Sequence, residues 1–220
     1  AQGFNGLNER LLKFIKKKNI HLIEDVCESH GATFRSKKLG TFGLISNFSF
    51  YYAHHMTTIE GGMISTNDKK VYEIIRMLRG HGLVRDAEFD STKRFFFKKY
   101  QDLNKEFIFS YPGYNLRSTE INAVIGINQL KSLNKNIIDR NKNFKFFLKN
   151  LDNKKYMTKF QMEGCSNYAL IIIFNQKYRN LQFRNRFEKR LISNNIEFRR
   201  GMSGGGNQIR QPYVKNFFKK

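Results

Sequence analysis

The spacing of apolar and polar positions predicts helices that alternate with short strands in the first part of the chain. Apolar residues at helical spacing predict helices at residues 7–18 and 71–78. Short apolar runs predict strands at residues 20–23, 45–52 and 63–66. Asn5 or Asn8 is suited to cap the first helix, because an Asn side chain accepts hydrogen bonds from free amides at a helix start. Asn67 or Asp68 is suited to cap the second helix. Such an alternation is typical of an α/β domain.

The pattern changes in the rest of the chain. Residues 85–109 mix charged and aromatic side chains without a period, which predicts a long connection with little regular structure. Two helices are expected next, at residues 118–130 and 134–151. The order strand, strand, helix, strand then predicts a small α+β domain, with the elements at residues 156–162, 168–174, 181–193 and 196–199. Residues 201–214 are too rich in glycine for regular structure, and we expect a mobile linker or an anion-binding loop there.

The composition indicates a globular protein. The chain has 220 residues, of which 40% are hydrophobic, so it can bury a substantial core. No apolar run approaches the roughly 20 residues of a membrane span, so no membrane partner is expected. Cys27 and Cys165 lack the spacing of a metal site or a disulfide framework, and they favour the reducing cytoplasm. Because the chain opens on Ala1 and closes on FFKK, we expect a fragment of a longer protein.

The net charge raises an alternative function. Lys and Arg number 40 against 18 Asp and Glu, which gives a net charge of +22. A charge of this sign attracts polyanions, and the FFFKKY segment adds aromatic side chains, so a basic nucleic-acid-binding protein is one alternative. The basic residues are spread along the chain, however, and no groove-reading or base-stacking motif accompanies them. We therefore do not expect nucleic acid to be the partner.

Candidate chemistry gathers where two predicted strands end. The strand at residues 20–23 runs into Glu24 and Asp25, and the strand at residues 45–52 leads to the adjacent His54 and His55. A histidine in a loop is most often a solvated or structural residue. In a parallel sheet, however, the carboxyl ends of the strands face the ligand crevice. The acid and the two histidines are therefore candidates for one site.

Five segments carry a resemblance to a known family. In chain order they are IEDVCESHGA, TFG, NFSFYYAHHMTTIEGGMISTND, LRGHG and PGYNLRSTEINAVIG. Together they resemble the sugar-nucleotide aminotransferases of the DegT/DnrJ/EryC1/StrS family, over about residues 20–151. The resemblance implies the α/β fold of type I enzymes dependent on pyridoxal 5′-phosphate, with a mostly parallel sheet. Residues 1–133 would then be the C-terminal part of the large cofactor-binding domain, and residues 134–220 the connecting helix and a partial small α+β domain.

The resemblance assigns cofactor-binding roles to four positions. Asp25 stands where the family holds the pyridine nitrogen, and a carboxylate there keeps the ring protonated as an electron sink. Glu28 takes the place of a residue that is usually Gln. Ser49 resembles the serine that binds the cofactor phosphate, and Asn115 resembles the asparagine that reaches this phosphate from the neighbouring subunit. The resemblance therefore implies a homodimer, and it implies no metal ligand.

The departure at His54 changes the expected reaction. In the aminotransferases the fifth residue after the serine is the lysine that forms a Schiff base with the cofactor, whereas here it is His54. Histidine at this position resembles the 3-dehydratases of GDP- or CDP-linked 4-keto-6-deoxyhexoses, in which it acts as a base. His55 is the second candidate, because a shift of one residue in the loop would exchange the two. The implied reactants are pyridoxamine 5′-phosphate, a nucleotide-linked 4-keto sugar, and L-glutamate, which regenerates the amine form of the cofactor.

The iron–sulfur relatives need a cysteine cluster that Cys27 and Cys165 cannot supply, which favours the branch without a cluster. Beside the nucleic-acid-binding alternative, two further alternatives stay open. One is a C4 aminotransferase that has recruited Lys37 or Lys38 from a nearby loop. The other is that the fragment is inactive without its missing ends.

Overall fold

The computed structural model describes residues 2–201 and 207–218. Contacts within the chain define two compact units, one formed by Ala1–Leu151 with Thr158–Ile171 and the other by Asp152–Met157 with Ile172–Lys220. The domain boundary that we predict between residues 133 and 134 falls inside helix α4 (Glu120–Lys149) of the first unit, and it stays a prediction.

The first unit contains a mixed sheet, which confirms the α/β class. Its strand order is β1-β4-β5, with bounds Ile23–Asp25, Ile45–Ser49 and Gly62–Ser65. Strand β1 runs parallel to β4, and β5 runs antiparallel to β4, so the described sheet is mixed rather than mostly parallel. A separate hairpin pairs β2 (Thr33–Phe34) with β3 (Lys37–Lys38). Strand β4 ends three residues before the predicted limit of 52, because the chain turns there into the histidine loop.

The short strand β1 is anchored by a buried acid. Ile23 and Asp25 are exposed, whereas Glu24 is only 7% exposed and points inward. Its carboxylate accepts hydrogen bonds of 2.7 Å from the backbone amides of Gly40, Phe42 and Gly43. Buried charges persist only where hydrogen bonds compensate the lost hydration. Glu24 therefore ties the loop that precedes β4 to β1.

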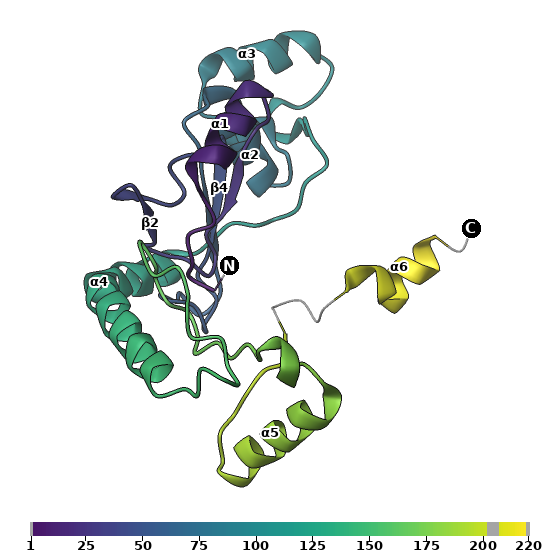
Figure 1. Cartoon of the computed structure of the whole chain (residues 1–220). Helices are drawn as coiled ribbons and strands as arrows, with labels where there is room; N and C mark the ends of the chain where they lie inside the picture. Colours follow the sequence, from purple (N-terminus) through teal and green to yellow (C-terminus); the bar gives the residue numbers. More distant parts are fainter. Residues whose placement is uncertain (1, 202–206, 219–220) are drawn as a thin grey trace. The chain divides into compact units, whose positions relative to one another are not determined.

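The helices of the first unit partly differ from the prediction (Figure 1). Helices α1 (Glu9–Lys17) and α2 (Lys69–Arg79) form as predicted, with Asn8 and Asp68 as their N-caps. The segment expected to be irregular contains helix α3 (Asp90–Lys99) and the short helices η1 (Val84–Asp86) and η2 (Lys105–Phe107). Helix α3 buries none of its residues, which explains why its sequence shows no apolar period.

Helix α4 (Glu120–Lys149) is one helix of 30 residues, where the sequence predicted two. No Gly or Pro interrupts residues 130–134, and Leu133 in this stretch is buried, so nothing there ends the helix. Its N-terminal part exposes a row of apolar side chains, with Ile121, Val124 and Ile127 each more than 60% exposed. Within the described part of the chain, no helix combines the length and the apolar character needed to cross a bilayer.

The second unit is built around an aromatic cluster. The side chains of Tyr156, Phe174, Phe183 and Phe187 pack with ring centroids 5.1–6.5 Å apart. Helix α5 (Leu181–Ser193) forms as predicted, and η3 (Gln176–Tyr178) precedes it.

The predicted strands of the α+β domain do not form in the described residues. A single bridge between Tyr156 and Phe174 is the only strand-like pairing found there. The glycine-rich tail contains η4 (Gln208–Arg210) and helix α6 (Pro212–Phe217), so the prediction that it lacks regular structure is wrong for residues 208–214. Pro212 stands at the first position of α6, where a missing amide costs nothing. Residues 202–206 of the predicted loop lie outside the described residues.

Candidate active site

The carboxyl ends of β1 and β4 bring Asp25 and Ser49 to the same edge of the sheet. The two strands are parallel, with Asp25 in register with Asn47, and Ser49 follows two residues later. The hydroxyl oxygen of Ser49 accepts a hydrogen bond from the amide of Tyr51 at 3.3 Å. The hydroxyl proton remains available to a ligand oxygen. This edge therefore offers an anionic acceptor and a neutral donor.

The Asp25 carboxylate is held by two donors. Its Oδ1 accepts from the Cys27 amide at 3.2 Å and from Asn47 Nδ2 at 3.1 Å. Contact with the Cys27 side chain is the main cause that lowers the pKa of Asp25, and these two donors lower it further. Asp25 is thus ionised at neutral pH, which suits a cationic N–H group of a ligand.

His54 is the less buried of the two loop histidines. Its Nδ1 lies 3.1 Å from the carbonyl oxygen of Ser49. Because a carbonyl can only accept, Nδ1 carries the proton and Nε2 is left as the basic nitrogen. The rings of Tyr51 and Tyr168 flank the imidazole edge-on, with centroids at 5.5 and 5.7 Å. The backbone of Ser49 therefore orients a potential proton acceptor.

His55 is buried and ties two segments together. It is 4% exposed, and its Nε2 lies 2.9 Å from the carbonyl oxygen of Ser166. Burial is the main cause that lowers the pKa of His55. This arrangement is structural and favours His54 over His55 as the base.

Sequence reasoning missed a third histidine in this cluster. His30 is 3% exposed, and its ring centroid lies 5.8 Å from that of His55 and 6.4 Å from that of His54. Neither ring nitrogen has a hydrogen-bond partner among the described residues. Burial, aided by the two neighbouring histidines, lowers the pKa of His30 to about 4. Its place within the IEDVCESHGA segment, which carries the family resemblance, was the one signal that could have suggested it.

Glu28 and Asn115 have different surroundings. Glu28 is half-buried, and its Oε2 accepts from the Gln2 amide at 3.0 Å. Asn115 is exposed, its backbone bridges to Gly80, and its Oδ1 accepts from the Arg117 amide at 3.3 Å. No hydrogen bond links Asn115 to the other predicted site residues within the described chain. Its predicted contact with a phosphate in a second subunit stays a prediction.

The two lysines of the aminotransferase alternative lie on β3. Lys37 and Lys38 are both exposed, and Lys38 Nζ donates to the Gly31 carbonyl at 3.4 Å. In the part of the chain that the structure describes, neither lysine makes a hydrogen bond or ion pair with Asp25 or His54.

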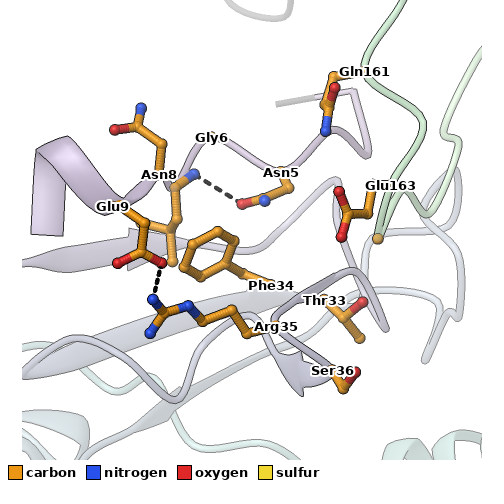
Figure 2. Close-up of a pocket in the computed structure, with 12 residues that line it drawn as sticks. Asn5, Gly6, Asn8, Glu9, Thr33, Phe34, Arg35, Ser36, Gln161 and Glu163 are labelled. Atoms are coloured by element: carbon orange, nitrogen blue, oxygen red, sulfur yellow. Dashed lines mark hydrogen bonds and ion pairs between the residues drawn. The ribbon is translucent and has the colours of Figure 1, made fainter.

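Two open cavities of about 500 Å³ each lie elsewhere on the first unit. One separates the start of α1 from the β2–β3 hairpin, and Arg35 forms an ion pair with Glu9 across it (Figure 2). The other lies beside Lys38, Phe48 and Leu133. None of the six predicted site residues lines either cavity. The candidate site is therefore the open edge of the sheet.

Comparisons with known proteins bear on these residues. The model of the DegT/DnrJ/EryC1/StrS aminotransferase family matches residues 8–218. The GDP-4-keto-6-deoxy-D-mannose 3-dehydratase of Escherichia coli O55:H7 is 40% identical over 160 residues, which are 73% of this chain and 41% of that protein. The enzyme of the same name from Yersinia pseudotuberculosis is 35% identical over 96% of this chain and 52% of its own length.

A solved structure shows the same fold. It is GDP-4-keto-6-deoxymannose-3-dehydratase with a trapped PLP-glutamate geminal diamine, and it superposes with a TM-score of 0.73 at 30% identity. The match covers 89% of this chain and 50% of that protein. The chain spans about half the length of the curated relatives it matches.

Proposed function

Because the chain belongs to the DegT/DnrJ/EryC1/StrS aminotransferase family, we propose that it is part of a pyridoxamine-phosphate-dependent 3-dehydratase of a nucleotide-linked 4-keto-6-deoxyhexose. The family and the type I fold confirm what the motifs predicted. The choice of reaction rests on His54, which the sequence resemblance aligns with the family's Schiff-base lysine, and its support in the structure is the contact of 3.1 Å between His54 Nδ1 and the Ser49 carbonyl. Relatives named as GDP-4-keto-6-deoxy-D-mannose 3-dehydratases support it.

The residues present fit the cofactor. The ionised Asp25 carboxylate matches a protonated pyridine nitrogen, and the Ser49 hydroxyl can donate to a phosphate oxygen. When bound, pyridoxamine phosphate supplies an amine that condenses with the sugar ketone and a ring that accepts electrons. We propose that Glu28 flanks the same ligand, since it follows Asp25 by three residues on the same loop.

His54 supplies the proton transfer in this proposal. With Nδ1 donating to the Ser49 carbonyl, Nε2 would accept one proton from the bound reactants and return it to the C3 hydroxyl, which would leave as water. An imidazole is the side chain that most often acts as a general base in enzymes. A base positioned in this way typically contributes about 10²–10⁴-fold to the rate.

The partners follow from the same proposal. The substrate is a nucleotide-linked 4-keto sugar, and L-glutamate is the amino donor, as the glutamate adduct of the related structure suggests. The net charge of +22 favours encounter with a phosphorylated substrate. Asn115 would complete the site of a second copy in a homodimer. The free thiols of Cys27 and Cys165 fit a cytoplasmic location.

The test is product analysis by mass spectrometry. The full chain is incubated with pyridoxamine phosphate, L-glutamate and a panel of nucleotide-linked 4-keto-6-deoxyhexoses. A sugar that has lost its C3 oxygen is expected, whereas a sugar that has gained an amine would establish the aminotransferase alternative. His54→Asn should still bind the cofactor and give no deoxygenated sugar, while the exposed His21→Asn control keeps the parent activity. Full activity of His54→Asn would refute the assigned base.

A further inference from the structure

Asp25 is contacted by a side chain that the sequence motifs did not assign. Asn47, in the middle of β4, directs its Nδ2 to Asp25 Oδ1 at 3.1 Å. The same nitrogen lies 3.2 Å from the Cys27 sulfur. Asn47 thus joins the two residues that surround the carboxylate.

The sheet register places Asn47 there. Asp25 and Asn47 are partners across the parallel pair of β1 and β4, and the Val26 amide donates to the Asn47 carbonyl at 2.9 Å. Side chains of registered partners leave the same face of a sheet, so the Asn47 amide reaches Asp25 without displacing the backbone. An ionised carboxylate only accepts, and the atom that faces it must therefore be the NH₂ group.

The hydrogen bonds from the Cys27 amide and from Asn47 Nδ2 end on the same carboxylate oxygen, Oδ1. Neither of these two bonds occupies Oδ2, which can accept from a ligand. Without Asn47, only contacts with Cys27, two residues further along the chain, would restrain the exposed carboxylate from rotating about its last torsion. Two donors from two elements fix a rotation that one donor does not.

We propose that Asn47 is a positioning residue, which holds Oδ1 of Asp25 so that Oδ2 presents one fixed acceptor to the protonated ring nitrogen of the cofactor. This inference rests on the proposed function, because the cofactor is the ligand that it concerns. Asn47 itself touches neither the cofactor nor the reacting atoms. Its effect passes entirely through the orientation of Asp25.

The first test uses the chain without cofactor. In the full chain, hydrogen exchange at the Cys27 amide reports its bond to Asp25, and exchange at the Val26 amide reports the neighbouring backbone bond. In Asn47→Leu and in the isosteric Asn47→Asp, the Cys27 amide is expected to exchange about tenfold faster while the Val26 amide is unchanged. Equal acceleration of both amides, or no acceleration of either, would overturn the inference.

The second test measures affinity. Pyridoxamine phosphate is expected to bind Asn47→Leu about tenfold more weakly than the parent, because a hydrogen bond to a charged group is lost. The analogue with CH in place of the ring nitrogen should bind both proteins equally. The exposed Asn143→Leu on α4 is the matched control and should behave as the parent.

The possible results distinguish the inference about Asn47 from the proposed function. An equal loss of affinity for both compounds would mean that Asn47 acts only on the fold, which overturns the inference. A parent chain that binds neither compound would refute the proposed function, and the exchange rates at Cys27 and Val26 would still decide whether Asn47 positions Asp25.

Discussion

The buried histidine His30 allows a quantitative test of the candidate site. His30 is 3% exposed, and its two ring nitrogens lack partners among the described residues. Burial lowers its pKa from 6.5 to about 4, and repulsion from His55 and His54 adds to this. Above pH 6.5 the ring is neutral in both the folded and the unfolded chain. As the pH falls from 6.5 toward 4, the unfolded chain binds a proton that the folded chain rejects, so stability is lost.

The size of this loss follows from the shift. Each pKa unit corresponds to about 1.36 kcal/mol, so the shift from 6.5 to about 4 is worth about 3 kcal/mol. Of this loss in the free energy of unfolding, about 2 kcal/mol occurs between pH 7 and pH 5, because the unfolded chain takes up its proton over that range. His30→Leu removes the group and keeps a similar volume. Between these two pH values, the variant should lose about 2 kcal/mol less of its free energy of unfolding than the parent.

The assay is urea unfolding of the full chain at pH 7, 6 and 5, followed by far-ultraviolet circular dichroism. The exposed His21→Leu serves as the control and should show the pH dependence of the parent. His55, whose pKa is also lowered, is present in every variant, so the difference isolates His30. If His30→Leu and the parent lose the same free energy between pH 7 and pH 5, His30 is not buried as a neutral base.

Two further predictions concern the acids of β1. Glu24→Ala should lower the free energy of unfolding by about 3 kcal/mol or more, because three backbone amides lose their acceptor. Glu24→Gln should recover part of this loss, and thermal unfolding measures both variants. The pKa of the Cys27 thiol is raised to about 12, first by burial and then by Asp25, so alkylation of Cys27 at pH 8.5 should be slow. Asp25→Asn should accelerate this alkylation severalfold in a Cys165→Ala background, and an unchanged rate would contradict the contact.

The elements near the site could be predicted because local rules determine them. An apolar run revealed β4, and side-chain caps revealed the starts of α1 and α2, whereas the run at residues 20–23 shares only Ile23 with β1. The parallel pairing of β1 and β4 places Asp25 at the end of the sheet from which the histidine loop leaves, as the parallel-sheet rule predicted.

The features that the sequence did not predict depend on packing and on contacts between distant residues. Helix α3 lies on the surface without a buried face, so apolar periodicity gave no sign of it. The strands expected at residues 156–162 and 168–174 were inferred from apolar runs, yet these segments divide between the two units, and Tyr156 and Phe174 pack in an aromatic cluster that needs no ladder of strand hydrogen bonds. The roles of Glu24, His30 and Asn47 depend on partners 16 or more residues away or on burial, and spacing along the chain carries no such information.

If the proposed function holds, the geometry of His54 gives a physical reason why one side chain would change the reaction class of this scaffold. The imidazole is oriented by the main-chain carbonyl of Ser49, which any residue at that position would present. A lysine in the same place could attach covalently to the cofactor, whereas an imidazole forms no stable Schiff base and keeps Nε2 for proton transfer. The groups proposed to bind the cofactor, Asp25 and Ser49, belong to the strands and need not change with it. Under the proposed function, the choice between amination and dehydration would therefore depend on the loop between β4 and β5, while the sheet would supply what both reactions share.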